Sequence, residues 1–313
     1  MKLGMIFPGQ GSQTIGMGKE FYDRYDSVKE LFKQADEATG APITKLCFEG
    51  PEEELRKTEN TQPAILTVSV ACQKVLAEHG VLPEMVAGHS LGEYSALVAA
   101  GVLSFADAVA VVKKRGRFMQ EAVPLGRGAM AAVLGLSREK IVEICLDSSS
   151  DQAPVQAVNF NCPGQVVIAG STEAVQIAEG KLKEAGAKRV IGLPVSAPFH
   201  SILMQPAALR LQKELDEIDF HDAKIPVVVN VDGSVVTKGN ELRNLLVRQA
   251  AAPVFWEDCM IKMAKEGITL FVEAGPGKVL SGFTKKILKD AESLNVEDLA
   301  SLEKSLDYLK GVR

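Results

Sequence analysis

Residues 86–97 read VAGHSLGEYSAL, and this stretch predicts the turn around which the rest of the chain is organised. A strand candidate (85–87) comes before Ser90 and a helical pattern (93–100) follows it. The glycines two positions to either side of the serine suit a sharp strand-to-helix turn, where side chains have no room. A nucleophilic serine above a sheet is therefore predicted, with an ordinary structural turn as the alternative.

Outward from this turn, strands and helices alternate, which is typical of an α/β layer with a parallel sheet. Before and after the turn we expect a strand at 2–7 and helices at about 17–38, 51–58, 63–79 and 105–121. Beyond residue 196 the expected elements are helix 203–217, strand 225–231, helices 240–251 and 256–266, and strand 268–273. The polar tail from about residue 290 is expected to form a surface helix.

The pattern changes between residues 127 and 195. The order strand, helix, two strands, helix, strand is the βαββαβ order of a ferredoxin-like unit. We therefore expect an α/β fold in which a larger α/β-hydrolase-like domain with a parallel sheet (1–126 and 196–313) carries an inserted small ferredoxin-like domain (127–195).

The amino-acid composition is typical of a globular protein and argues against a nucleic-acid-binding or membrane-spanning one. Hydrophobic residues make up 46% of the 313 residues and charged residues 24%, as in globular proteins with a substantial core. A net charge of −5 argues against non-specific nucleic-acid binding. No run of about 18 apolar residues predicts a membrane span. The five cysteines show no C-x-x-C spacing, so we expect reduced thiols and a cytoplasmic protein.

No motif indicates a cofactor or a metal. The stretch Gly9–Thr14 fails the dinucleotide fingerprint because its third glycine is replaced by Thr14. Gly277-Lys278-Val279 is not a phosphate-binding loop, and no H-E-x-x-H or paired Cys/His set is present. We therefore expect neither a metal nor a cofactor, although the backbone of the Gly9 loop can approach a ligand closely.

Four histidines are candidates for the base that activates Ser90. His79 ends a helix, His89 adjoins the serine on a turn where neighbours diverge, and His221 lies in a polar connector. His200 lies where the small domain rejoins the large one, and domain junctions favour active sites. We favour His200, with a buried structural histidine as the alternative. No acidic residue is well placed to complete a triad.

Four stretches together resemble one family. They are Phe7–Gln13 (FPGQGSQ), Gly88–Glu93 (GHSLGE), Arg115–Gln120 (RGRFMQ) and the loop that carries His200. In order and spacing, from about Leu3 to Lys289, the chain resembles the acyltransferase family of fatty acid and polyketide synthesis, which includes malonyl-CoA:acyl carrier protein transacylases.

The resemblance implies a covalent relay. Ser90 would carry the malonyl ester and His200 would be the general base. Gln249 matches the position whose backbone carbonyl accepts a hydrogen bond from that histidine, which accounts for the absent acid. A carbonyl can set the tautomer of His200, but it stabilises an imidazolium less than a carboxylate does.

The resemblance also implies the binding residues. The backbone N–H groups of Gln10 and Leu91 would form the oxyanion hole, and Arg115 would bind the malonyl carboxylate with its planar fork. Without the resemblance, Arg115 belongs to a solvated basic run. Phe199 is expected to crowd a branch at C2 of the acyl group, which favours malonyl over methylmalonyl.

The expected activity is transfer of a malonyl group from malonyl-CoA to acyl carrier protein for fatty acid synthesis. The alternatives are a polyketide-type acyltransferase acting in trans, a serine thioesterase or esterase, and a binding module without activity. Because the carrier is typically acidic, we expect a basic docking patch, with an ordinary solvated surface as the alternative. Its candidate residues are Lys113, Lys114, Arg117, Lys285, Lys286 and Lys289.

Overall fold

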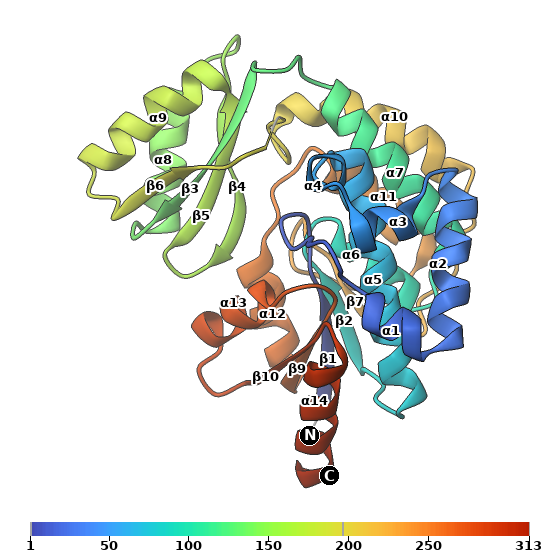
Figure 1. The fold of residues 1–313 in the computed structure, drawn as a ribbon. Coiled ribbons are helices and arrows are strands. Elements are labelled where there is room, and N and C mark those ends of the chain that lie inside the picture. Colours follow the sequence, from blue (N-terminus) through green and yellow to red (C-terminus); the bar gives the residue numbers. More distant parts are fainter. Residues whose placement is uncertain (1, 196, 313) are drawn as a thin grey trace.

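The computed structural model describes residues 2–195 and 197–312 and contains two separate β-sheets covered by helices (Figure 1). The domain boundary expected at residue 196 lies outside the described residues. Five strands of the larger sheet are parallel, and a sixth, β8, pairs antiparallel with β7 at one edge. Across the sheet the strands are β10 (Glu292–Val296), β9 (Ile268–Ala274), β1 (Lys2–Phe7), β2 (Met85–Gly88), β7 (Val227–Val228) and β8 (Val235–Val236).

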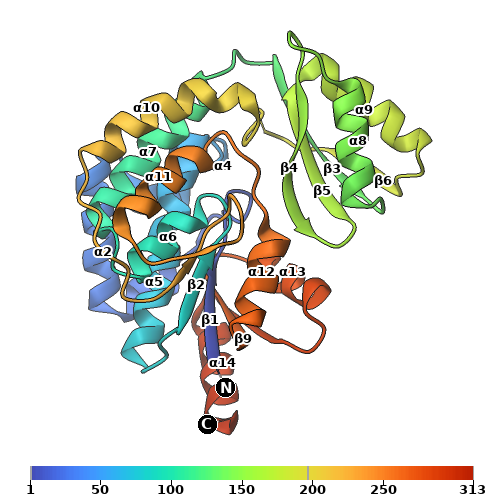
Figure 2. The ribbon, with the colours of Figure 1, turned by 180° about the vertical axis from the view of Figure 1, so that it is seen from behind.

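Helices cover both faces of this larger sheet (Figure 2). Because successive strand side chains point to opposite faces, Met5 and Phe7 join the main core while Ile6 joins a second cluster behind the sheet. The main core is formed with helices that include α5 (Thr58–Glu78) and α6 (Gly92–Ala99), and the second cluster with α12 (Trp256–Lys265) and α13 (Val279–Ile287). Burial on both faces explains why the central strands are almost wholly apolar.

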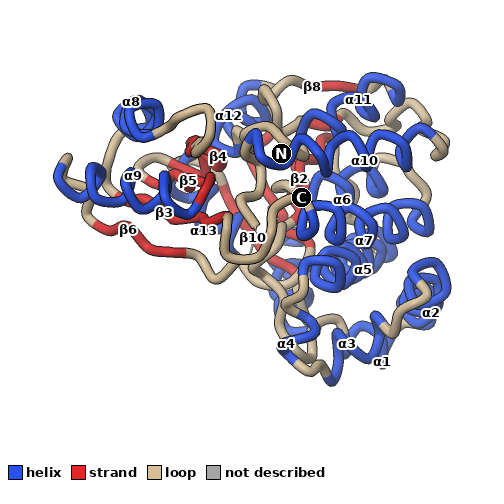
Figure 3. The backbone as a smooth tube through the Cα atoms, turned by 90° about the horizontal axis from the view of Figure 1, so that it is seen from above, coloured by secondary structure: helices blue, strands red, loops and turns tan. Residues whose placement is uncertain are grey.

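The smaller sheet is antiparallel, with strand order β4-β5-β3-β6. Its elements, in chain order, are β3 (Gly128–Leu134), α8 (Arg138–Ser148), β4 (Val155–Cys162), β5 (Gln165–Ser171), α9 (Thr172–Glu184) and β6 (Arg189–Gly192). Ala131 and Val133 pack with α8 and α9, whereas Met130 and Ala132 face the main core. Seen from above, this sheet with its two helices lies beside the larger sheet (Figure 3).

Backbone hydrogen bonds join the two sheets. The Phe160 N–H donates to the Val254 carbonyl at 2.9 Å, and the Val254 N–H donates to the Val158 carbonyl at 2.7 Å. The segment before α12 thus pairs with β4 through one isolated parallel bridge, between Asn159 and Val254. Close to His200, the Ile202 N–H donates to the Gln156 side-chain oxygen at 2.7 Å. These bonds hold the smaller sheet against the segments that carry the site.

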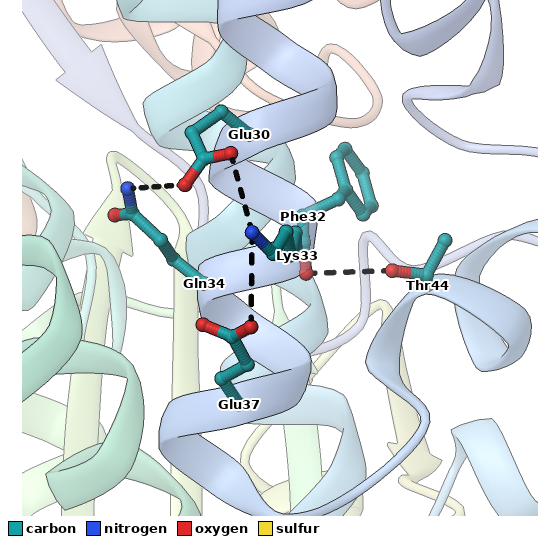
Figure 4. Close-up of polar contacts among 6 residues, drawn as sticks. All are labelled: Glu30, Phe32, Lys33, Gln34, Glu37 and Thr44. Atoms are coloured by element: carbon teal, nitrogen blue, oxygen red, sulfur yellow. Dashed lines mark hydrogen bonds and ion pairs between the residues drawn. The ribbon is translucent and has the colours of Figure 1, made fainter.

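The remaining helices form the outer layer. They are α1 (Lys19–Arg24), α2 (Asp26–Thr39), α3 (Ile43–Glu49), α4 (Glu52–Leu55), α7 (Phe105–Glu121), η1 (Ile202–Met204), α10 (Gln205–Asp216), α11 (Gly239–Gln249) and α14 (Leu299–Val312). On the solvent face of α2, Lys33 lies 3.9 Å from both Glu30 and Glu37 (Figure 4). The Thr44 hydroxyl donates to the Phe32 carbonyl at 3.4 Å, which links α3 to α2. The exposed ion pairs of Lys33 stabilise the helix only slightly.

Four expected elements differ from the structure. The helix expected over 51–58 is only the short α4, because α5 already begins at Thr58. The helix expected over 17–38 is two helices, because Tyr25 is extended between α1 and α2. The strand expected over 225–231 is only β7, after which the chain turns into β8. The tail after residue 290 was expected to be wholly helical, yet it first forms β10. That strand's sequence, ESLNV, has little strand signal of its own, and pairing with β9 supplies the missing stability.

Candidate active site

The turn at Ser90 is as sharp as its glycines indicate. Ser90 has φ 52°, in the left-handed region that non-glycine residues rarely adopt. A Cβ on Gly88 would lie 1.9 Å from the backbone of Gly92, and a Cβ on Gly92 would lie 2.1 Å from the Phe7 carbonyl oxygen. The turn lies between β2 and α6, so Ser90 stands at the carboxyl end of a central strand.

His200 is brought to Ser90 from a distant part of the chain. Its Nε2 lies 2.6 Å from the Ser90 Oγ, and its Nδ1 lies 2.9 Å from the Gln249 carbonyl oxygen. Because a carbonyl can only accept, Nδ1 carries the proton and Nε2 faces the serine with its lone pair. Burial, followed by the nearby Arg115 charge, lowers the pKa of His200 to about 3. At neutral pH the imidazole is therefore a neutral base.

The two residues expected to supply the oxyanion hole, Gln10 and Leu91, both line the cavity that contains Ser90. Gln10 follows β1 and Leu91 starts the first turn of α6. Within residues 2–195 and 197–312, neither backbone N–H donates to a protein acceptor. The Gln10 side chain is held by the Thr58 hydroxyl at 3.2 Å. Backbone donors without a protein acceptor, in residues that line the serine's cavity, are suited to stabilising an oxyanion.

Arg115 is 2% exposed and comes from the middle of α7. Its Nη1 donates to the Gln62 side-chain oxygen at 2.8 Å, and its Nη2 donates to the Gln249 side-chain oxygen at 3.0 Å and to the Ser90 Oγ at 3.3 Å. Among the described residues no carboxylate lies within 4.0 Å of the guanidinium, and its Nε has no acceptor. Burial lowers the pKa of Arg115, which is still cationic at neutral pH. A buried cation that no carboxylate touches, and that the nearby Glu93 charge partly balances, is suited to an anionic ligand.

The cavity at Ser90 lies between the two sheets and has a volume of about 100 Å³. The larger-sheet part of the molecule contributes the serine, the histidine and the arginine. The smaller-sheet part contributes a mostly apolar wall made of Met130, Asn159, Leu193 and Val195. Phe199 lies in the same lining beside His200, where the sequence predicts that it crowds the acyl group.

Within the described ranges, no group of three or more His, Cys, Asp or Glu side chains is arranged to hold a metal ion. Nor does any helix in that part of the chain have the length and apolar character needed to cross a membrane.

Comparison with known proteins identifies the family. The model of the acyl transferase domain family matches residues 5–308. The chain belongs to the acyl transferase domain family. The resemblance predicted from four short stretches is thereby confirmed over nearly the whole chain, as is the mixed α/β class with a parallel and an antiparallel sheet.

The relatives of this acyl transferase are similar over their full length. The malonyl CoA-acyl carrier protein transacylase of Bacillus subtilis (strain 168) is 48% identical over 309 residues, which cover 99% of this chain and 98% of that protein. The protein of the same name from Escherichia coli (strain K12) is 49% identical over 303 residues, covering 96% and 98%.

Solved structures agree in fold. A malonyl CoA-acyl carrier protein transacylase from Clostridium perfringens matches with a TM-score of 0.96 and 47% identity, covering 100% of this chain and 98% of that one. A malonyl-transacylase in complex with its type II PKS acyl-carrier protein matches with a TM-score of 0.95 and 45% identity, covering 98% and 100%.

Sequence reasoning missed several polar residues around the Ser90 site of this acyl transferase. Gln62 holds Arg115, and Asn230 accepts a hydrogen bond from the Ser90 N–H at 2.7 Å. Asn230 was detectable in principle, because it follows β7 at the carboxyl edge of the parallel sheet. Ligand-binding sites of α/β folds usually lie at this edge. Gln62 lies inside a helix with no local signal.

Two of the other histidines, His89 and His79, have structural side-chain partners. The His89 Nε2 lies 2.9 Å from the Asn161 side-chain oxygen, across the junction of the two sheets. The His79 Nε2 lies 3.1 Å from the Tyr25 hydroxyl at the end of α5. Neither imidazole nitrogen of these residues bonds the Ser90 hydroxyl.

The expected basic patch is divided between two helices. Its Lys113, Lys114 and Arg117 lie on α7. Lys285 and Lys286 lie on α13, and Lys289 follows its end. The two helices are well apart in two views (Figures 1 and 3). Lys114 pairs with Glu214 at 2.5 Å. If both groups bind a carrier, they do so from different sides of the molecule.

Proposed function

We propose that this acyl transferase moves a malonyl group from malonyl-CoA to the phosphopantetheine thiol of acyl carrier protein through an ester on Ser90. The observation that carries the proposal is a buried cation with no carboxylate in direct contact, beside a serine–histidine pair: Arg115 Nη2 lies 3.3 Å from the Ser90 Oγ. A malonyl group offers a thioester carbonyl and a free carboxylate. The names of the relatives from B. subtilis and E. coli support the same substrate pair.

In the first half-reaction, His200 Nε2 takes the proton of the Ser90 hydroxyl as Oγ attacks the thioester carbonyl. The Gln10 and Leu91 N–H groups stabilise the resulting oxyanion, each by about 3 kcal/mol. The C–S bond then breaks, His200 returns the proton to the departing CoA thiolate, and a malonyl ester remains on Ser90. The carrier thiol repeats these steps in reverse, with His200 taking the thiol proton and returning it to Ser90.

Arg115 would select the acyl group. Its guanidinium binds the malonyl carboxylate through its planar fork, which gives the buried cation an anionic partner in direct contact. An acetyl group would leave that cation without an anion, so the selection is partly repulsive. A thioesterase would gain nothing from such a cation, which favours transfer over hydrolysis. One relative was solved in complex with a type II PKS acyl-carrier protein. A carrier protein of polyketide synthesis is therefore the second candidate for the physiological acceptor.

Intact-mass measurement and peptide mapping test this proposal directly. The purified chain is mixed separately with malonyl-CoA and acetyl-CoA and quenched within seconds. The expected result is a malonyl adduct on Ser90, little acetyl adduct, and faster loss of the malonyl ester to acyl carrier protein than to water. Folded protein that takes no adduct from either thioester contradicts the proposal.

We also infer the organisation of the chain. The strand order β4-β5-β3-β6 and the βαββαβ element order support a ferredoxin-like insertion at 127–195 in an α/β-hydrolase-like domain formed by 1–126 and 196–313. We propose a cytoplasmic location, because Cys47, Cys72, Cys145, Cys162 and Cys259 are all unpaired thiols. We propose no cofactor, since Ser90 and His200 supply the chemistry of acyl transfer.

A further inference from the structure

Beneath Ser90 lies a buried carboxyl group that the proposed reaction does not use. Glu93 is one turn further along α6 and is 1% exposed. Its Oε2 accepts two hydrogen bonds, from the Asn230 N–H at 2.8 Å and from the Gln249 Nε2 at 3.1 Å. These two donors belong to segments that are far from Glu93 in sequence, so one oxygen atom joins three parts of the chain.

Asn230, the first of these partners, holds the serine turn. Its Oδ1 accepts from the Ser90 N–H at 2.7 Å, and its Nδ2 donates to the Gly88 carbonyl at 2.8 Å. Both bonds lie on the sharp turn, where Ser90 has an unfavourable positive φ. The Glu93 oxygen fixes the Asn230 backbone and thereby the position from which this side chain reaches the turn.

Gln249, the second partner, touches three groups of the site. Its backbone carbonyl accepts from His200 Nδ1, its Nε2 donates to the Ser90 carbonyl at 2.9 Å, and its Oε1 accepts from Arg115 Nη2 at 3.0 Å. The orientation of the side-chain amide is fully determined. A flipped amide would place its oxygen against the Ser90 and Glu93 oxygens and its NH₂ group against the guanidinium.

We propose that Glu93 is a positioning residue of the acyl transfer site, whose Oε2 holds Asn230 and Gln249 and through them sets Ser90, His200 and Arg115. This inference rests on the proposed function and extends it. Because both contacts of the Glu93 Oε2 are with N–H donors, Asn230 and Gln249 require an oxygen acceptor at the position of this atom.

The protonation of Glu93 fits this role. Burial raises the pKa of Glu93 to about 7, although the hydrogen bonds from Asn230 and Gln249 and the Arg115 charge lower it. A protonated carboxyl group keeps an oxygen that can accept, provided that the proton is on the other oxygen. The position of the acceptor, more than its charge, is therefore what the two partners need.

Three substitutions separate position from charge. Glu93→Gln keeps an oxygen at the same reach without the charge, Glu93→Asp keeps the charge but withdraws the oxygen by one methylene, and Glu93→Leu removes the acceptor. We expect Glu93→Gln to load malonyl on Ser90 within about fivefold of the unchanged chain. Glu93→Asp and Glu93→Leu should load about 10- to 100-fold more slowly, since small misplacements of reacting groups have effects of this size.

Selectivity supplies a readout that loss of stability would not change. Without the Glu93 acceptor, the Gln249 amide keeps its bond to the Ser90 carbonyl but loses the one to Glu93, so the acceptor that it presents to Arg115 is held less firmly. The ratio of malonyl to acetyl loading should therefore fall about tenfold or more in Glu93→Asp and Glu93→Leu and stay within about twofold in Glu93→Gln.

The matched control is Glu273, another buried carboxyl group whose pKa burial raises to about 7. It lies on β9 and accepts from the Leu280 N–H at 3.1 Å and the Ser281 N–H at 2.7 Å, in contact with no member of the Ser90 network. Glu273→Leu and Glu273→Asp should keep the malonyl-to-acetyl ratio, whatever they do to stability.

The inference is overturned if Glu93→Asp loads malonyl with unchanged rate and selectivity, if Glu93→Gln is as impaired as Glu93→Asp, or if the Glu273 variants lose selectivity equally. If Glu93→Leu does not fold, the loading rates and selectivities of Glu93→Gln and Glu93→Asp are enough to test the inference. If the unchanged chain takes no malonyl group on Ser90, the proposed function fails and this inference fails with it. If it loads normally and the Glu93 variants do too, only this inference fails.

Discussion

At the scale of single residues, the site depends on one buried cation. Arg115 donates three hydrogen bonds from its two terminal nitrogens, to Gln62, Gln249 and Ser90. All three acceptors are uncharged oxygens, and the centroid of the Tyr94 ring lies 5.5 Å from the guanidinium carbon. Burial of a cation with no carboxylate in contact is unfavourable, so an arriving carboxylate interacts strongly with Arg115.

Arg115→Ala should therefore lose selectivity. We expect malonyl loading on Ser90 to fall about 10- to 100-fold, the equivalent of a charge-assisted hydrogen bond of about 1.5–3 kcal/mol. Acetyl loading should fall much less, because acetyl has no carboxylate to bind. Arg117→Ala is the control on the same helix, since Arg117 is exposed. Equal losses for malonyl and acetyl would exclude Arg115 as the selector.

The pH dependence of loading should reveal the unusual state of His200. Its pKa is lowered to about 3 by burial and by the Arg115 charge. Because the base form exists above this pKa, lowering the pH from 7.5 to 5 should not protonate it. We expect rapid-quench loading rates at pH 5 to stay within about threefold of those at pH 7.5, whereas an unperturbed histidine would lose most activity. A midpoint near 6.5 assigned to His200 would contradict this prediction.

At the scale of elements, the strand–turn–helix unit at Ser90 depends on two glycines that touch backbone. Gly88 lies against Gly92, and Gly92 lies against the end of β1. These contacts let α6 start directly above the sheet edge, which places the Leu91 N–H beside the serine.

Gly88→Ala should break this unit. The added Cβ would lie 1.9 Å from the Gly92 carbonyl, and neither backbone can move without shifting β2 or α6. We expect a loss of about 3 kcal/mol or more in unfolding free energy, measured by denaturant titration. Gly180→Ala on the exposed face of α9 meets nothing within 4 Å and should stabilise by about 0.5–1 kcal/mol. A Gly88→Ala chain as stable as the original would show that the turn is looser than described.

At the scale of the whole molecule, the cavity exists because two sheets are held together. The bonds at Val254 and Gln156 tie the smaller sheet to segments that lead to Gln249 and His200. The outer face of α13 also belongs to this junction, since α13 packs beside β4 and carries Lys285 and Lys286 on its exposed side. An acidic carrier that delivers its thiol to the cavity would meet such a surface.

Charge reversal on α13 tests that surface. With Lys285→Glu and Lys286→Glu combined, we expect the KM for acyl carrier protein to rise about tenfold at low salt, with less effect at high salt and no change in the KM for malonyl-CoA. Lys304→Glu on the exposed side of α14 is the control. An unchanged carrier KM would exclude α13 from docking.

The chain's local patterns predicted those parts of the fold that depend on neighbouring residues. The turn at Ser90, the helix over 105–121 and the βαββαβ order from 127 to 195 all follow from turn glycines and hydrophobic periodicity. Elements stabilised by distant partners were missed: β10 forms only because β9 offers an open edge. The roles of the site residues stay predictions until loading is measured.

By itself the sequence determined a serine on a strand-to-helix turn, an α/β class and a family, because each depends on motifs or periodicity within short, contiguous segments of the chain. Only the tertiary structure decided that His200 Nδ1 meets the Gln249 carbonyl, that Arg115 is buried with no carboxylate in contact, and that one oxygen of Glu93 joins Asn230 to Gln249. These contacts join residues far apart in the chain. They arise from packing two sheets and their helices together, and no local pattern encodes which distant polar atoms will then meet.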